Sequence, residues 1–202
     1  TYDDLGLEAN EYGDAWIKMY DRWFSGEHGH ISAQDFECKT RGIIYGRGAE
    51  CNSLGQCGNS TISIDPLGDV YPCGSLSSHA NTLYGNIATQ SLQEIMNTKT
   101  AVSYRNREID SHCASCKWQH VCHGGCPARS YKFYGDHHHR DYYCPSLYKM
   151  YDHVEKRLQE KGVSAGLPHP EHFDDGLPEM LAEAQALTKQ YEQQQGIELK
   201  II

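Results

Sequence analysis

The spacing of the cysteines constrains this chain more than any other feature of its sequence. Seven of them form one string: Cys57, Cys73, Cys113, Cys116, Cys122, Cys126 and Cys144. Gaps of two, three and five residues between thiols, backed by distant partners, are typical of soft-metal sites. The cysteines of the chain suffice for two iron–sulfur clusters that each take four thiolate ligands. We therefore interpret the chain first as a cluster carrier.

The count and spacing of the cysteines also weigh against a disulfide framework. The chain has nine cysteines, an odd number, and two of them stand in a close C-x2-C pair. The sequence contains neither a signal-like apolar stretch nor a candidate membrane span. We therefore expect a cytoplasmic protein with no membrane partner. Four thiolates with a C-x2-C knuckle also suit zinc, so a zinc-binding structural or interaction module stays open as the alternative.

The charge balance narrows the class of partners. Acidic residues outnumber basic ones, 27 to 18, which gives a formal net charge of -9. Surfaces that bind phosphate backbones are normally basic, so we expect no nucleic acid partner. The 202 residues suffice for one sizeable domain, or for a small domain with helical appendages. Because the chain begins with Thr1 and not with methionine, we expect the natural protein to extend beyond it.

Hydrophobic periodicity predicts helices before and after the cysteine string. In residues 11–24, apolar side chains recur at three- and four-residue spacing, which indicates one face of an amphipathic helix. A second helix is expected to begin at Pro145 and to end before Gly162. Cys144 then lies just before a helix N-terminus, where the partial positive charge favours a thiolate.

Short strands are expected around the first cysteines. Two apolar runs, Ile31 to Phe36 and Ile43 to Tyr45, are expected to form strands. Residues 61–65 alternate polar and apolar side chains, residues 66–69 have turn chemistry, and residues 70–72 read as the returning strand. This pattern predicts a β-hairpin that delivers the next residue, a cysteine, to its partners.

The rest of the chain is expected to be helical or linking. Ser91 is a candidate N-cap for a short helix through Leu92, Ile95 and Met96. Residues 164–176 are rich in Gly, Pro, His and Asp and are expected to form a linker. A last helix is expected over residues 178–193, with these side chains on one side: Leu181, Ala184, Leu187 and Tyr191.

The full cysteine pattern points to a known family. It reads Cys57-x10-Gly68-x4-Cys73, then Cys113-x2-Cys116-x5-Cys122-x3-Cys126, then Cys144. This string resembles the seven-cysteine signature of the SPASM domain, the C-terminal auxiliary-cluster domain of radical S-adenosylmethionine (SAM) enzymes that modify peptides and proteins. Anaerobic sulfatase-maturating enzymes and RiPP maturases are similar in spacing, and they place an additional cysteine shortly before the hairpin. Cys51 fills that place.

The resemblance implies two 4Fe–4S clusters with interleaved ligands. Cluster I would be bound by Cys51, Cys57, Cys73 and Cys126. Cluster II would be bound by Cys113, Cys116, Cys122 and Cys144. Bacterial two-cluster ferredoxins cross their ligands in the same way, which ties the two halves of such a domain together.

The resemblance also implies an architecture. The expected fold class is α+β: a small metal-stapled domain with a β-hairpin, two Fe–S cluster sites and flanking helices, in which folding energy is linked to cluster binding. Residues 1–50 would be a remnant of, or a linker from, a radical SAM catalytic barrel. Residues 51–162 would be the SPASM auxiliary-cluster domain, and residues 163–202 a linker and C-terminal helix.

Two departures from the family limit the expected chemistry. The radical-generating motif C-x3-C-x2-C is missing, because Cys122-x3-Cys126 is followed by Arg129 where the third cysteine would stand. The chain alone is therefore expected to be inactive toward SAM, which would act only through a catalytic domain absent from this chain. Gly74 stands where sulfatase-maturating enzymes have an aspartate proposed as a base. Formylglycine formation therefore loses its best candidate residue.

The resemblance implies a role in electron transfer and in positioning a substrate peptide or protein. The expected partners are the radical SAM catalytic domain, that substrate, and a flavodoxin- or ferredoxin-like protein. A free-standing scaffold that recruits peptides stays open beside the zinc module. Cys38 falls outside the signature and is expected to be a small buried residue without ligand function. The run His137 to His139 is expected to form an exposed loop, with metal binding as the less favoured alternative.

Overall fold

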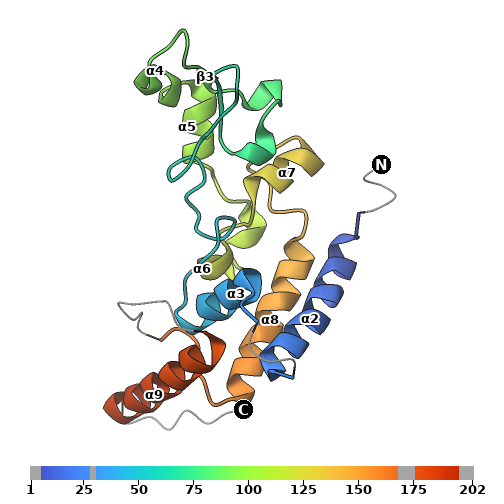
Figure 1. Ribbon diagram of the computed structural model, residues 1–202, viewed down its shortest axis with the longest axis vertical. Helices are drawn as coiled ribbons and strands as arrows, with labels where there is room; N and C mark the ends of the chain where they lie inside the picture. The colour runs from blue at the N-terminus through green and yellow to red at the C-terminus, as the bar shows by residue number, and fades with distance from the viewer. Residues whose placement is uncertain (1–5, 28–30, 168–175, 196–202) are drawn as a thin grey trace. The chain divides into compact units, whose positions relative to one another are not determined.

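The computed structural model describes residues 6–27, 31–167 and 176–195. These residues form helices and one small antiparallel sheet (Figure 1), so the fold belongs to the expected α+β class. They divide into two compact units. Unit 1 comprises residues 1–50, 120–122 and 143–202, and unit 2 comprises residues 51–119 and 123–142. In the part of the chain that the structure describes, no helix is long and apolar enough to cross a membrane.

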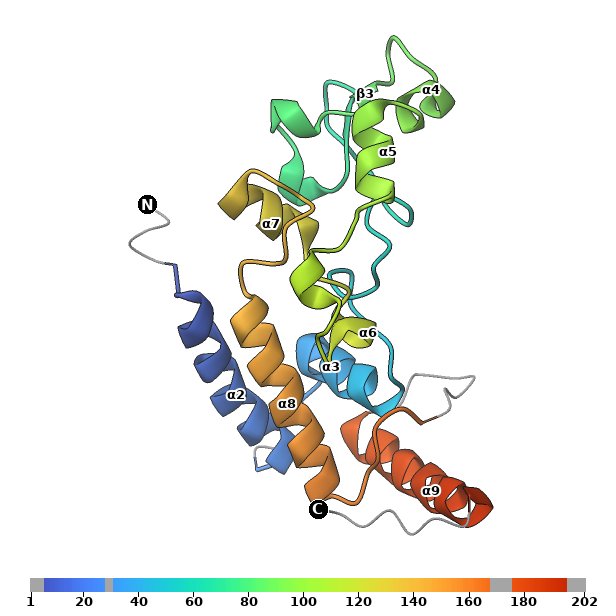
Figure 2. The same ribbon diagram turned by 180° about the vertical axis from the view of Figure 1, so that it is seen from behind.

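Unit 1 is built around two parallel helices of 17 residues, α2 (Ala9–Ser25) and α8 (Cys144–Glu160), which lie side by side in Figures 1 and 2. Contacts advance along both helices in the same direction, from Gly13 with Ser146 to Asp21 with Arg157. Both helices were expected from the sequence. On α2 the buried side chains are Trp16, Tyr20 and Phe24, one per turn of the helix. Close approach of the helices requires Gly13, because a Cβ there would lie 2.7 Å from Ser146 Oγ.

The predicted strands at residues 31–36 and 43–45 are wrong, because the structure has a helix there, α3 (Gln34–Ile44). Phe36, Thr40 and Ile43 recur at helical spacing and turn inward. Contacts from outside the run also fix the helix. The Thr40 hydroxyl lies 3.0 Å from the Tyr20 hydroxyl on α2, and Lys39 pairs with Glu50 beyond the helix at 2.9 Å. Short apolar runs do not separate helix from strand by periodicity alone.

The last helix, α9 (Leu177–Gln195), lies where the sequence predicted one, but its buried face differs. The buried side chains are Leu177, Met180, Ala184 and Thr188. Only Ala184 belongs to the predicted face, and Tyr191 is 45% exposed. The face is set by the segment before the helix, since Ser164 N–H donates to Thr188 Oγ1 at 3.2 Å.

Only part of the predicted linker, residues 164–176, lies among the described residues. Its residues 168–175 lie outside the described residues, whereas the described part pairs with the end of α3. Gly166 N–H donates to the Ile43 carbonyl at 3.2 Å, and Leu167 N–H donates to the Ile44 carbonyl at 2.7 Å.

Unit 2 contains the predicted hairpin. Strands β1 (Ser63–Ile64) and β2 (Asp69–Tyr71) pair antiparallel, with Ser63 opposite Tyr71 and Ile64 opposite Val70. The turn is made locally: Asp65 Oδ1 accepts from Leu67 N–H at 2.9 Å, and Gly68 has a positive φ of 87°. A third strand, β3 (Gly85–Asn86), pairs with β2 and was not predicted, because a two-residue strand leaves no periodic signal.

Unit 2 and its junctions also contain four α-helices: α4 (Leu92–Met96), α5 (Lys99–Arg105), α6 (Gln119–Cys122) and α7 (Pro127–Tyr134). Short 3-10 helices lie at Gly74–Leu76, Ala80–Thr82 and Ser111–Cys113. Ser91 caps α4 as predicted, in a capping box with Glu94. A buried cluster around Val70, Leu76 and Ile95 forms the core of this unit, and Cys73 and Cys126 pack against it. The core therefore positions two of the predicted ligands.

Candidate metal centre

The four cysteines predicted to bind cluster I all lie in unit 2. Electrostatic interactions between their thiols affect the pKa of Cys57. The pKa of the Cys57 thiol is raised to about 12, mainly by burial and to a smaller extent by the neighbouring thiols of Cys51, Cys126 and Cys73. Burial likewise raises the pKa of Cys73, next to Cys126 and Cys51. The structure thus places these four thiols within electrostatic range of one another.

Cys73 and Cys126 each lie directly before a helical element. Cys73 follows β2 and precedes a 3-10 turn over Gly74–Leu76. Backbone N–H groups of Ser75 and Leu76 hydrogen-bond to its sulfur and partly oppose the rise in its pKa. N–H donors around a cysteine sulfur are typical of the outer shell of metal–thiolate sites. Cys126 precedes α7, whose first residue is proline.

Asp141 fixes the backbone at Cys126, and the sequence alone did not single it out. Its side chain is 1% exposed and accepts a hydrogen bond from Cys126 N–H at 2.7 Å. Arg129, the residue that stands in place of a third radical-SAM cysteine, donates to the same carboxylate from Nη2 at 2.6 Å. Gly125 is required beside it: its φ is +71°, and a Cβ there would lie 2.5 Å from Asp141 Cβ.

Arg107 places a guanidinium among the thiols, and it too was missed in the sequence. Nη1 donates to the Gly125 carbonyl at 2.9 Å, and Nη2 donates to the His139 carbonyl at 2.7 Å. Burial lowers the pKa of Arg107, whereas Cys57, the Asp141 carboxylate, Cys126 and Cys113 favour its charged form. Among the described residues, its Nε is buried without a hydrogen-bond partner.

A small cavity adjoins the first group of thiols. It measures about 70 Å³, and its lining includes Cys57, Arg107 and His123. His123 ends α6 in a left-handed conformation, and its Nδ1 lies 2.7 Å from the Ser53 carbonyl. A carbonyl only accepts, so Nδ1 carries the proton in this contact.

The donor set in unit 2 fits an iron–sulfur cluster. Thiolates are the ligands of such clusters, and a cluster with four of them carries net negative charge. The N–H groups at Cys73 and the guanidinium of Arg107 supply the positive partial and full charges that such a group needs. Which thiol binds which cluster stays a prediction.

The four cysteines predicted to bind cluster II come from both units. Cys113 and Cys116 lie in unit 2, whereas Cys122 and Cys144 lie in unit 1. Cys113 and Cys116 form one tight turn, with Cys116 N–H donating to the Cys113 carbonyl at 3.1 Å. Cys144 is the first residue of α8, one position further into the helix than expected. Their assignment to one cluster stays a prediction.

Two features outside the signature can now be placed. Cys38 lies half-buried on α3, and burial followed by the nearby carboxylate of Glu50 raises its pKa. The histidine run is not the exposed loop that the sequence suggested. The ring of His137 stacks on Tyr104 with centroids 3.9 Å apart, which leaves this loop half-buried against α5.

Comparisons with known proteins identify a matching family and two relatives. Residues 51–117 match SPASM, a family described as an iron–sulfur cluster-binding domain. An AdoMet-dependent heme synthase of Methanosarcina barkeri (strain Fusaro / DSM 804) is 31% identical over 116 residues, 56% of this chain and 28% of that protein. A serine-type anaerobic sulfatase-maturating enzyme of Klebsiella aerogenes is 22% identical over 124 residues, 60% of this chain and 30% of that protein.

A solved structure shares the fold. Native anSMEcpe with bound AdoMet and Cp18Cys peptide superposes with a TM-score of 0.63 at 22% identity, covering 76% of this chain and 43% of that one. The chain thus spans less than a third of each curated relative and less than half of the solved structure.

Proposed function

Since residues 51–117 form a segment of the SPASM iron–sulfur cluster-binding family, we propose that this chain is the auxiliary-cluster domain of a radical SAM maturase of peptides or proteins. It binds two 4Fe–4S clusters, the first through Cys51, Cys57, Cys73 and Cys126 and the second through Cys113, Cys116, Cys122 and Cys144. The gathering of the first four thiols in unit 2 is the observation that carries this proposal. The second ligand set rests on the family resemblance.

The proposed clusters supply electron transfer, because irons that are fully ligated by cysteine have no open position for substrate. The chain's own residues then have three tasks. They present thiolates, they keep N–H donors at Cys73, and they hold a cation, Arg107, beside Cys57 and Cys126. The electron partner is a flavodoxin- or ferredoxin-like protein in the cytoplasm.

The catalytic reaction belongs to a domain outside this sequence. The chain lacks C-x3-C-x2-C, and both curated relatives are more than three times as long as their matched part. One of those relatives is named a sulfatase-maturating enzyme, and the solved structure has a bound peptide. These observations support a radical SAM catalytic domain and a peptide or protein substrate as partners.

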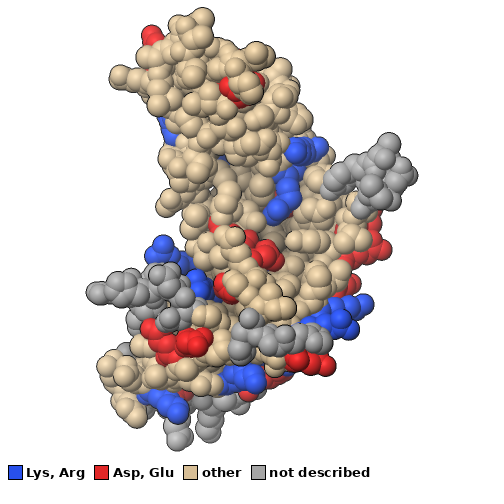
Figure 3. Space-filling view, in the orientation of Figure 1, with Lys and Arg blue, Asp and Glu red and all other residues tan. Residues whose placement is uncertain are grey.

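Exposed apolar side chains at the hairpin support a role of this region in positioning the substrate. Ile64, Leu67 and Ile87 are 48%, 79% and 47% exposed, which gives the hairpin and the end of β3 an apolar surface. In the view of Figure 3, few charged side chains cover the region of β3, α4 and α5. These exposed apolar side chains are the support for proposing that a substrate peptide binds at the hairpin.

A matched pair of cysteine variants tests the cluster proposal. After anaerobic reconstitution, Cys57→Ala is expected to retain about half the iron of the wild type, because one complete four-thiolate set remains. Cys38→Ala, which removes a thiol outside both sets, is expected to retain all of it. Iron, sulfide and zinc are measured in the same samples. Equal loss in both variants, or a colourless wild type that binds only zinc, would contradict the proposal.

A further inference from the structure

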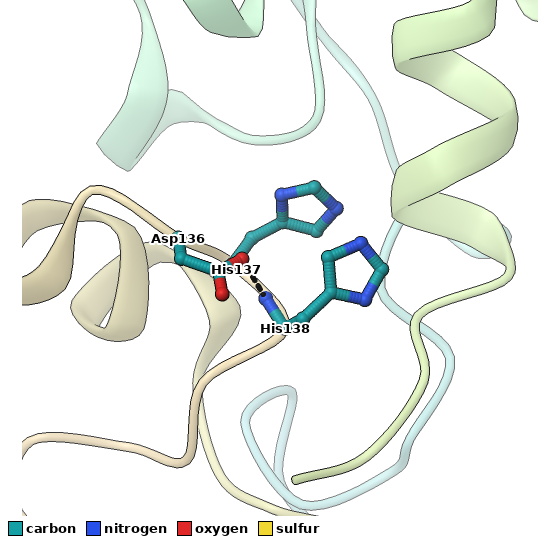
Figure 4. A group of neighbouring side chains, drawn as sticks. All are labelled: Asp136, His137 and His138. Carbon is teal, nitrogen blue, oxygen red and sulfur yellow. Dashed lines mark hydrogen bonds between the residues drawn. The ribbon is translucent and has the colours of Figure 1, made fainter.

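The loop after α7 gathers metal-ligating side chains that lie outside both proposed ligand sets. Asp136, His137 and His138 each offer one ligand atom, and these atoms all lie within 4.8 Å of one another. Figure 4 shows the carboxylate and the two imidazoles on neighbouring positions of one loop in unit 2. Both imidazoles are half-buried.

The loop is held in place at both ends. At its start, Gly135 ends α7 with a φ of +72°, and its N–H donates to the Tyr131 carbonyl at 2.8 Å. At its end, the His139 carbonyl accepts from Arg107 at 2.7 Å. Ligand groups on an anchored loop lose less conformational freedom on binding than groups on a free one.

The side chains themselves are also oriented. The Asp136 carboxylate accepts from His138 N–H at 2.9 Å, which turns it toward the imidazoles (Figure 4). The His137 ring stacks on Tyr104, inclined by only 10° to it. The rings of His137 and His138 have their centroids 4.2 Å apart.

Two imidazole nitrogens converge on one point. Ser103 Oγ lies 3.0 Å from His137 Nε2 and 3.3 Å from His138 Nε2. A hydroxyl has one proton and can donate it to only one of the two rings. Ser103 therefore cannot occupy the lone pairs of both imidazoles.

We propose that Asp136, His137 and His138 bind one divalent transition-metal ion. Two imidazoles and a carboxylate suit zinc and its first-row neighbours, and three protein ligands leave a position for water. Zinc bonds of about 2.0–2.1 Å at tetrahedral angles bring ligand atoms to roughly 3.4 Å from one another. The ligand atoms lie within 4.8 Å of one another, so metal binding requires them to approach by at most about 1.4 Å.

His139, the next residue of the run, is the natural control. Its Nδ1 lies 2.9 Å from the Arg140 carbonyl, and its ring packs on Tyr134 with centroids 3.8 Å apart. It is therefore turned to other partners and does not belong to the ligand set.

The test is a calorimetric titration with zinc under anaerobic conditions. The protein is this chain with its clusters loaded and without a polyhistidine tag, so that the cysteines are occupied. We expect one saturable zinc site, weakened more than about tenfold by His137→Gln or His138→Gln, because even loss of a group that only orients a metal ligand commonly costs that much. His139→Gln is expected to stay within about threefold of the wild type.

Asp136→Asn keeps the test decisive if a histidine variant fails to fold. Asparagine retains an acceptor for His138 N–H but loses the anionic ligand, so this variant should keep its iron and bind zinc more weakly. Iron content in every sample separates failure of this site from failure of cluster binding. Absence of a saturable zinc site in the loaded wild type, or equal weakening by His139→Gln, would overturn the proposal.

Discussion

At the scale of single residues, the site depends on charges that the cysteine pattern does not contain. Arg107 donates to the carbonyls of Gly124, Gly125 and His139, so its guanidinium is fixed by backbone groups while it lies near Cys57, Cys126 and Cys113. A fixed cation near a cluster stabilises its more negative, reduced state. Arg107 is therefore expected to raise the reduction potential of a cluster bound there.

Replacing that cation should be measurable as a shift in potential. Arg107→Gln is expected to make the potential more negative by roughly 40–90 mV, the size that an interaction of about 1–2 kcal/mol between partly buried charges gives a one-electron couple. The measurement is a redox titration followed by electron paramagnetic resonance. Lys99→Gln, an exposed change on α5, serves as the control and should leave the potential within about 10 mV. A positive shift in Arg107→Gln would contradict this role.

At the scale of elements, the turn before α7 sets the position of Cys126. Gly125 and Gly135 bracket that helix and have almost the same positive φ, +71° and +72°. They differ in space: a Cβ at 125 would meet Asp141 at 2.5 Å, whereas nothing lies within 4 Å of one at 135. Comparing the same substitution at the two positions therefore distinguishes the cost of backbone strain, which both share, from the cost of displacing the Asp141 carboxylate, which arises only at position 125.

This difference predicts unequal effects of the same substitution. Gly135→Ala should cost about 1 kcal/mol, the usual penalty of a side chain in this conformation. Gly125→Ala should cost at least about 3 kcal/mol, because overpacking adds to that penalty and moves the group that holds Cys126 N–H. The temperature at which the visible cluster absorbance disappears, and the iron content, measure both. Equal behaviour of the two variants would contradict the account of this turn.

The elements also show what the sequence could predict. The hairpin was predictable because Asp65 and Gly68 make its turn with local hydrogen bonds and a positive φ. Helix α3 was not, since its placement depends on Tyr20 of α2 and other distant partners. The buried face of α9 was misassigned for the same reason, because Thr188 is held by Ser164 N–H across the segment before the helix.

For the candidate metal centre too, some residues could be identified from the sequence and others could not. Candidate ligands can be named from the sequence because only a few residue types bind iron–sulfur clusters and their spacing is visible in the chain, and their assignment to clusters stays a prediction. Asp141 and Arg107 were not predictable, because their partners are mostly backbone groups that only the fold brings to them.

At the scale of the whole molecule, the chain is expected to act only together with a catalytic domain. Under strong reductant it should not cleave SAM, because Arg129 occupies the place of a third cysteine and its guanidinium is held by Asp141. The assay measures 5′-deoxyadenosine, with an anaerobic sulfatase-maturating enzyme as the positive control. Product above a no-protein blank would show that the chain contains a radical-generating site.

The central proposal is that this single chain holds two complete four-thiolate clusters. The most direct measurement is the iron and acid-labile sulfide content of the reconstituted wild-type chain, with Mössbauer spectroscopy to identify the cluster type. We predict about eight iron and about eight sulfide per chain, all in 4Fe–4S form. Saturation at four iron and four sulfide would contradict the claim.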